Sequence, residues 1–184
     1  MTHYINPMVA KRQLQIIKGT ILGGSSLVKP TKGRNCYLSM RGKNAKWIDY
    51  KASELSVYSS LAPFTLEKTN RWHSLCYPIF SEMREMFYDG KKRCLNPNAL
   101  DDLQDIAFMI WYGDAGHYKN NSIILNTNIW GKKGTEVIGE YFNLLNYNCI
   151  IFKNRESYRI RLDEDSSLDL LKKISPHFPH FFNH

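Results

Sequence analysis

The chain has 184 residues, of which 43% are hydrophobic and 13% aromatic, and it carries a formal net charge of +8 with a pI near 9.3. This length fits one domain or two fused repeats, and the apolar content excludes a largely disordered chain. No apolar run reaches the roughly 18 residues of a membrane-spanning helix, and the first residues lack a cleavable signal pattern. We therefore expect an intracellular protein with no membrane partner, and the basic charge favours a polyanion such as nucleic acid.

The first half of the chain predicts helix, strand, helix, hairpin and helix, in that order. Leu14, Ile17 and Ile21 recur at helical spacing and predict a helix over 9–23 that ends at a glycine-rich turn. Alternating apolar and polar residues predict a strand over 35–41. The remaining elements are a helix over 44–59, a hairpin with strands over 63–65 and 71–76, and a helix over 78–88 with proline in its first turn.

The segment 89–98 is polar and rich in turn-forming residues, which predicts a linker between two repeats, 1–88 and 99–184. The second repeat follows the order of the first. The predicted elements are a helix over 100–112, a strand over 122–127, a helix over 135–145, a hairpin with strands over 148–152 and 157–162, and a helix over 166–174 capped by Asp165 or Ser166.

The two halves stay nearly in phase. Leu22 matches Tyr112 at an offset of 90 positions, and Trp72 matches Tyr158 at an offset of 86. This duplication predicts an α+β fold of two αββαββα units related by a pseudo-two-fold axis, with saddle-shaped sheets that could enter the major groove of DNA. Small residues would let the two first helices of the repeats approach closely, namely Gly19, Gly23, Ala107 and Gly113.

Each repeat opens with an apolar helix that ends at glycines, in Ile21-Leu22-Gly23-Gly24-Ser25 and in Ile110-Trp111-Tyr112-Gly113-Asp114-Ala115-Gly116. Further signatures are Lys32-Gly33-Arg34-Asn35, Arg71-Trp72-His73-Ser74 before Pro78-Ile79-Phe80, and Gly90-Lys91-Lys92. Over about residues 11–184 the chain resembles the single-chain, two-repeat form of the LAGLIDADG homing endonuclease family. The resemblance implies a monomeric, intron-encoded nuclease of a mobile element that recognises a long specific site in double-stranded DNA.

In that family each motif helix delivers one carboxylate to a scissile phosphate, and a divalent cation such as Mg²⁺ or Mn²⁺ assists phosphodiester hydrolysis. This chain departs from the pattern, because the two acid positions fall on Gly24 and Ala115. A shift of one residue would make Asp114 the metal-binding and catalytic acid of the second repeat. The family's two basic active-site residues match Lys92 in the linker and His184 at the end of the chain.

Three interpretations stay open at this point. The chain could nick DNA with Asp114, it could bind DNA or intron RNA without cleavage, as an intron maturase or a regulator would, or it could be a deliberately inactivated enzyme. A structural role in a ribonucleoprotein also fits the charge. The abundance of Asn, Ile, Lys and Tyr is typical of an AT-rich genome, and it suggests phage-infected host cytoplasm or a mitochondrion or other organelle.

Basic and polar residues on the predicted strands and their connecting loops are candidate DNA contacts. Loop lysines suit phosphates, and strand arginines suit guanine edges. The candidates are Lys29, Lys32, Arg34, Asn35, Tyr37, Ser39, Arg41, Lys43, Arg71, His73, Lys119, Asn126, Asn128, Lys153, Arg155, Arg159 and Arg161. His117 follows the second motif directly, which predicts a place near the scissile phosphate.

The remaining candidate metal ligands have simpler explanations. The acidic residues 101–105 are expected to favour the start of the second motif helix, and the aromatic tail from Phe178 onward is expected to pack on the body of the protein. No cysteines form a C-x-x-C pair, so a zinc knuckle is not expected, and Cys36, Cys76 and Cys149 are predicted to be small core residues.

Overall fold

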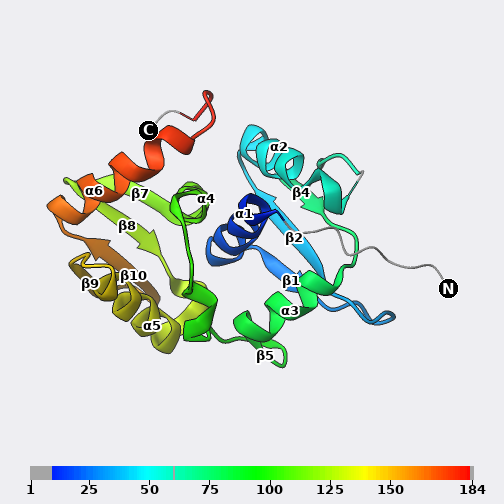
Figure 1. Cartoon of the computed structure of the whole chain (residues 1–184), viewed down its shortest axis with the longest axis horizontal. Coiled ribbons are helices and arrows are strands. Elements are labelled where there is room, and N and C mark those ends of the chain that lie inside the picture. The colour runs from blue at the N-terminus through cyan, green and yellow to red at the C-terminus, as the bar shows by residue number, and fades with distance from the viewer. Residues whose placement is uncertain (1–9, 60, 183–184) are drawn as a thin grey trace.

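The computed structural model describes residues 10–59 and 61–182, which form two similar halves (Figure 1). In the first half a motif helix leads into a four-stranded sheet with two covering helices. Its elements are α1 (Lys11–Leu22), β1 (Ser26–Val28), β2 (Tyr37–Gly42), α2 (Ala45–Glu54), β3 (Phe64–Leu66), β4 (Thr69–His73) and α3 (Pro78–Phe87).

A small hairpin, β5 (Tyr88–Asp89) and β6 (Lys92–Arg93), leads into the second half. There the same order returns in α4 (Asp105–Ala115), β7 (Gly116–Lys119), β8 (Ser122–Asn126), α5 (Gly131–Leu144), β9 (Cys149–Asn154), β10 (Ser157–Leu162) and α6 (Glu164–Ile174).

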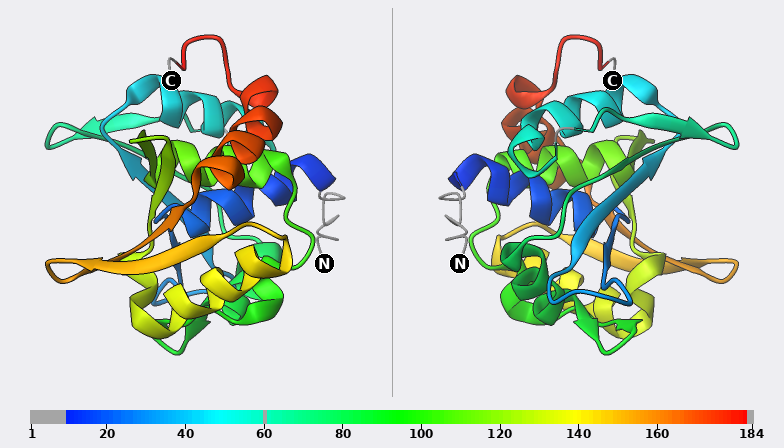
Figure 2. Two further views of the ribbon diagram at one scale, coloured as in Figure 1. Left: turned by 90° about the vertical axis from the view of Figure 1, so that its left-hand side faces the viewer. Right: turned by 90° about the vertical axis from the view of Figure 1, so that its right-hand side faces the viewer.

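The two four-stranded sheets have the same topology. The strand order is β1-β2-β4-β3 in the first and β7-β8-β10-β9 in the second, and all neighbouring strands are antiparallel. This arrangement confirms the predicted α+β class and the duplicated order of elements. Figure 2 shows that the hairpins β3–β4 and β9–β10 project on the same side of the molecule.

Apolar and polar residues alternate along the inner strands, and one face of each sheet is buried. Leu38 and Met40 on β2 and Ile123 and Leu125 on β8 have 2% or less of their surface exposed. Helices α2 and α3 pack against the first sheet and α5 and α6 against the second, while α1 and α4 lie together at the centre (Figure 1). The opposite face of each sheet is therefore left for polar side chains.

The sequence missed the short strands β1 and β7, which follow the motif turns directly. Strand β1 has only three residues, and β7 is a polar Gly-His-Tyr-Lys run without an apolar alternation. The start of α4 was also predicted five residues too early. The side chains of Gln15 and Lys18 donate to the backbone carbonyls of Asp102 and Asp101, at 2.8 and 2.6 Å, and hold that segment outside the helix.

Two smaller expectations were wrong. The N-cap of α6 is Asp163, whose carboxylate accepts from the backbone N–H of Ser166 at 2.9 Å, because the helix begins two residues earlier than predicted. Cys36 is buried, but Cys76 is exposed and Cys149 only half-buried.

Within residues 10–59 and 61–182, no helix combines the length and the apolar character that crossing a bilayer requires.

Candidate nucleic-acid interface and active site

The motif helices α1 and α4 approach closely at two glycines, Gly19 within α1 and Gly23 directly after it. A Cβ atom added to Gly19 would lie 2.4 Å from the carbonyl oxygen of Ala107 and 2.8 Å from the Cβ of Ile110. A Cβ on Gly23 would lie 2.3 Å from the Cβ of Asp114. Only glycine fits at either position, which confirms the predicted close approach. Gly113 is different, because it faces the indole ring of Trp47 in the first half.

The same contacts show which residues of the two halves are equivalent. Gly19 faces Ile110 and Gly23 faces Asp114, and both pairs lie 91 positions apart. Residues on a two-fold axis face their own equivalents, so 91 is the offset of the motif helices. Leu22 therefore matches Gly113 and not Tyr112 as predicted.

This offset makes Gly24 the equivalent of Ala115, the two positions where the sequence placed the missing acids. Gly24 has a φ of +122°, and an added Cβ would meet nothing within 4 Å. Ala115 is the last residue of α4 and is half-buried. Neither position carries a side chain with a metal-binding oxygen.

Asp114, the remaining acid of the second motif, is bound to the first half of the chain. The Nζ of Lys51 lies 2.6 Å from its Oδ1 and 2.7 Å from its Oδ2, and the indole Nε1 of Trp47 donates to Oδ1 at 2.7 Å. The Lys51 side chain is 1% exposed and that of Asp114 is 11% exposed. Both carboxylate oxygens thus accept charge-assisted hydrogen bonds from a buried ammonium group.

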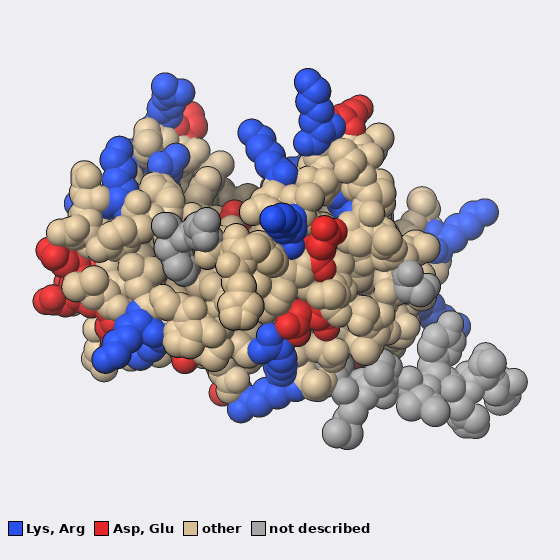
Figure 3. Space-filling model, turned by 90° about the horizontal axis from the view of Figure 1, so that it is seen from above, with Lys and Arg blue, Asp and Glu red and all other residues tan. Residues whose placement is uncertain are grey.

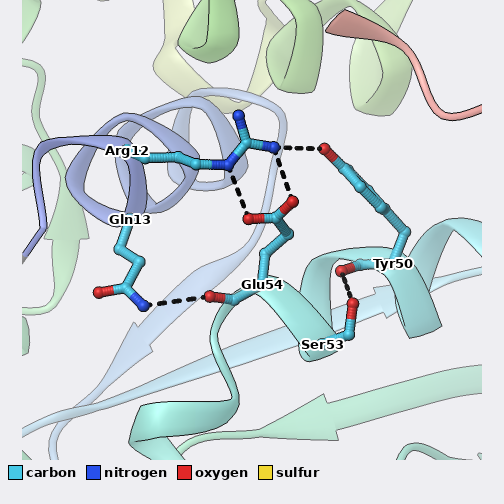
Figure 4. Close-up of polar contacts among 5 residues, drawn as sticks. All are labelled: Arg12, Gln13, Tyr50, Ser53 and Glu54. Atoms are coloured by element: carbon cyan, nitrogen blue, oxygen red, sulfur yellow. Dashed lines mark hydrogen bonds and ion pairs between the residues drawn. The ribbon is translucent and has the colours of Figure 1, made fainter.

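Helix α2 holds Trp47 and Lys51 in this place because its C-terminal end is tied to α1 (Figure 4). The guanidinium of Arg12 donates to both carboxylate oxygens of Glu54, at 2.6 and 2.8 Å, and to the hydroxyl of Tyr50. This hydrogen-bonded pair lowers the pKa of the Glu54 carboxyl and raises that of Arg12.

A second tryptophan makes the equivalent contact in the opposite direction, from the second half to the end of α1. The Nε1 of Trp130, in the second half, donates to the carbonyl of Leu22 at the end of α1 at 3.3 Å. The guanidinium of Arg93 lies over the Trp130 ring, 5.2 Å from its centroid. Each half therefore places a tryptophan against the end of the other half's motif helix.

Arg93 also reaches the first acid position. Its Nη2 donates to the carbonyls of Gly24 and Ser25 at 3.1 and 2.6 Å, and to the hydroxyl of Ser26 at 3.1 Å. Burial lowers the pKa of this guanidinium. The predicted residue Lys92 is exposed on β6, so its neighbour Arg93 is the linker cation that contacts the motif turn.

The aromatic tail packs where the sequence predicted. The ring centroids of Phe178 and Phe182 lie 6.2 and 4.9 Å from that of Trp47, and Phe181 contacts Tyr50. The end of the second half thus covers α2 of the first half. The second predicted basic residue, His184, lies outside the described residues.

The predicted base-reading residues share the sheet faces opposite the core. Trp72 on β4 and Ile160 on β10 are buried, so the residues before and after them face the other way. This face carries Tyr37, Ser39, Arg41, Arg71 and His73 in the first sheet and Asn126, Arg159 and Arg161 in the second.

The other predicted DNA contacts lie at the ends and turns of the strands. Lys29, Lys32, Arg34 and Asn35 belong to the β1–β2 connection, Lys43 and Asn128 follow β2 and β8, Lys119 ends β7, and Lys153 and Arg155 belong to the β9–β10 hairpin. Figure 3 shows Lys and Arg side chains on two projections that flank a hollow. Among these candidates, Lys153 is paired with Glu156 at 2.9 Å.

Two cavities border the motif turns. One of about 370 Å³ is lined by Ala115, His117, Asn126, Asn128 and Arg159, and the other, of about 330 Å³, by Gly24, Arg41, Lys43 and Asn44. Gly23 and Asp114 line both cavities. Burial, together with the charges of Arg159 and Lys119, lowers the pKa of His117 and favours its neutral form.

The sequence profile of the LAGLIDADG DNA endonuclease family matches residues 14–170. The chain belongs to this family. A search of curated proteins found no match.

Several solved structures share the fold of this chain. The homing endonuclease I-WcaI bound to its DNA recognition sequence superposes with a TM-score of 0.86 at 20% identity, over 96% of this chain and 88% of that one. I-DmoI in complex with DNA and Mn gives 0.58 at 14% identity, over 89% and 96%. Full-length DUF199/WhiA from Thermatoga maritima gives 0.57 at 13% identity, over 90% of this chain and 56% of that one.

The LAGLIDADG acid positions do not fit a divalent cation in this chain. Mg²⁺ and Mn²⁺ prefer carboxylate, carbonyl and water oxygens, but Gly24 and Ala115 supply no side-chain oxygen. The adjacent Asp114 is neutralised by Lys51, and Arg93 places a second positive charge on the Gly24 carbonyl. Among the described residues no group of three or more His, Cys, Asp or Glu side chains could hold a metal ion.

Proposed function

We propose that this LAGLIDADG protein recognises a long specific site in double-stranded DNA as a monomer and does not hydrolyse it. The observation that carries the proposal is the duplicated pair of sheets, each with a face of arginines and uncharged polar side chains. A two-stranded ribbon fits the major groove, and two ribbons related by a pseudo-two-fold axis match the symmetry of a duplex.

The positions of the basic residues support base recognition by the strands and phosphate contact by the hairpins and loops. Strands present Arg41, Arg71 and Arg159 to base edges, while hairpin and loop residues such as Lys32 and Arg155 reach the backbone. Neutralising phosphates releases counterions, so binding should weaken steeply with salt. The similar proteins I-WcaI and I-DmoI were both solved with DNA bound, which supports a duplex partner for this chain as well.

The state of Asp114 supports binding without hydrolysis. In the family a metal ion neutralises charge on the scissile phosphate and activates water, yet here Lys51 takes both oxygens of the only remaining motif acid. The motif turns instead offer DNA neutral backbone and fixed positive charge. The role that the sequence analysis gave to Asp114, as a metal ligand, is replaced in this proposal by a role in joining the two halves.

A nicking enzyme is the second candidate, because Asp114 borders both cavities at the motif turns. It would require that DNA binding draw Lys51 away from the carboxylate.

The test begins with selection of bound duplexes from a random library, in EDTA and in Mg²⁺ or Mn²⁺. We expect one enriched motif, equal affinity with and without the cation, and no cleaved strand in a plasmid that carries the motif. A single-stranded RNA of matched length serves as competitor and should displace the duplex poorly. Nicks or breaks that depend on the cation and vanish in Asp114→Asn would replace this proposal with the second candidate.

A further inference from the structure

We infer that Arg71 and Arg159 are an equivalent pair of specificity-determining residues, each of which reads a guanine, at two positions of the DNA site that lie symmetrically about its centre. This inference rests on the proposed DNA-binding function and deepens it.

The equivalence follows from the strand registers. With the offset of 91, Ser26 on β1 corresponds to His117 on β7. Ser26 lies opposite Ser39 on β2, and His117 lies opposite Ile124 on β8, so Ser39 corresponds to Ile124. One residue further along those strands, Met40 lies opposite Trp72 and Leu125 lies opposite Ile160. Trp72 therefore corresponds to Ile160, two places beyond the predicted match with Tyr158, and Arg71 corresponds to Arg159.

The surroundings of the two arginines are also equivalent. Phe64 on β3 lies directly opposite Arg71, and Phe152 on β9 lies directly opposite Arg159. Directly opposite residues of an antiparallel pair share one face of the sheet. Each arginine thus stands beside one phenylalanine on the polar face, in the middle of its sheet.

Both guanidinium groups are held without a counter-ion. The Nε of each has almost no accessible surface and no hydrogen-bond partner among the described residues, so each side chain is enclosed as far as this atom. The terminal nitrogens are not among the enclosed unpaired atoms, and neither arginine has an ion pair within the described chain. Each guanidinium group is thus fixed at its Nε, while its terminal nitrogens stay available to donate hydrogen bonds to an acceptor on a bound molecule.

The place of the pair favours a base edge over a phosphate. Arg159 lines the cavity beside the motif turn, together with Asn126, and Arg41, the cross-strand neighbour of Arg71, lines the other cavity. Both arginines therefore lie in the middle of the polar sheet face, whereas the hairpin turns carry the lysines that can contact the DNA backbone. Arginine binds guanine O6 and N7 with two parallel hydrogen bonds, which is the commonest specific major-groove contact.

The neighbours of the pair differ, and this difference should make the two half-sites unequal. Arg71 lies opposite Arg41, while Arg159 lies opposite Asn126. Asparagine suits adenine, so the base beside the second guanine should be an adenine.

The experiment selects duplexes from a random library with the wild-type chain and with Arg71→Gln and Arg159→Gln. Glutamine cannot donate to both O6 and N7 of guanine and pairs with adenine instead. We expect each variant to lose its guanine preference at one position, by on the order of tenfold, with the two positions symmetric about the centre of the motif. Lys172→Gln, at an exposed position of α6 outside the proposed DNA contacts, removes one positive charge as well, and as the matched control it should leave the motif unchanged.

Thermal unfolding checks that each variant is folded, and Arg71→Met and Arg159→Met replace any glutamine variant that is not. Motifs that remain unchanged, or affinities that fall equally for all sequences as a phosphate contact predicts, would overturn the inference. A wild-type chain that enriches no motif would overturn the proposed function and this inference together, whereas a motif insensitive to both arginines overturns only the inference.

Discussion

Gly23 and Asp114 face each other across the pseudo-two-fold axis, so closely that a side chain on the glycine would overlap the aspartate Cβ at 2.3 Å. The aspartate is directed by this contact toward Lys51 and Trp47 of the other half. The helix contact and the buried ion pair are therefore parts of one junction between the halves.

Gly23→Ala should destabilise the protein by at least about 2 kcal/mol, because overpacking of a helix contact forces the backbones apart. Urea unfolding measures the effect. Gly42→Ala is the control, since its added Cβ would lie at an ordinary 3.4 Å from Ile48, and it should change the free energy of unfolding by less than about 0.5 kcal/mol. Equal effects of the two changes would contradict this account of the junction.

Lys51→Ala should cost about 3 kcal/mol of stability, because it leaves the Asp114 carboxylate mostly buried and unpaired. The double change Lys51→Met with Asp114→Leu should recover most of that loss, since an apolar pair removes both charges. The exposed pair of Lys132 and Glu136 is the comparison, and Lys132→Ala should cost less than about 1 kcal/mol. Additive effects of the two changes at the buried pair would show that the charges do not interact.

Stability should fall as the pH drops from 7 toward 5.5, partly because of His73 and His117. Burial, followed by the nearby arginine charges, lowers the pKa of both histidines in the folded state below the ordinary value of 6.5. The unfolded chain then binds protons first as the pH passes below 6.5, which favours unfolding until the folded-state values are reached.

Urea unfolding across this pH range tests the assignment. The double change His73→Gln with His117→Gln should flatten the curve between pH 7 and 5.5. A wild-type slope retained by the double variant would assign the pH dependence to other groups.

Phe182→Ala should destabilise the chain by about 2 kcal/mol, because its ring packs on Trp47 at a centroid distance of 4.9 Å and joins the tail to the first half. Phe181, with 38% of its surface exposed, is the matched control, and its change to alanine should cost less than about 1 kcal/mol. Melting temperatures measure both effects. A similar decrease for the two variants would show that the contact of Phe182 with Trp47 is no more important than any other loss of apolar surface.

The sequence predicted the central features because they depend on spacing alone. The apolar periods of the motif helices and the repeated order of elements indicated the duplication, and the glycines indicated the close helix contact. Strands β1 and β7 could not be recognised, because their pairing with β2 and β8 comes from the fold and not from their own short sequences.

The partner of Asp114 was missed although a signal was present. Lys51 stands four residues after Trp47, on the stripe that also carries Ile48 and Leu55, and a lysine on an apolar stripe needs a buried counter-charge. Its identity could not be predicted, because the acid lies in the other repeat, 63 positions away. Arg93 was overlooked for a related reason: a run of basic residues does not reveal which one folds inward.

The burial of the two motif helices has a consequence for biosynthesis. Residues Gln15–Leu22 of α1 and Ala107–Tyr112 of α4 are buried around nearly their whole circumference, so neither helix has a water-tolerant side. While only the first repeat has emerged from the ribosome, the apolar surface of α1 stays uncovered, because α4 has not yet been translated. Premature termination in the linker should therefore yield an insoluble fragment rather than a smaller working protein.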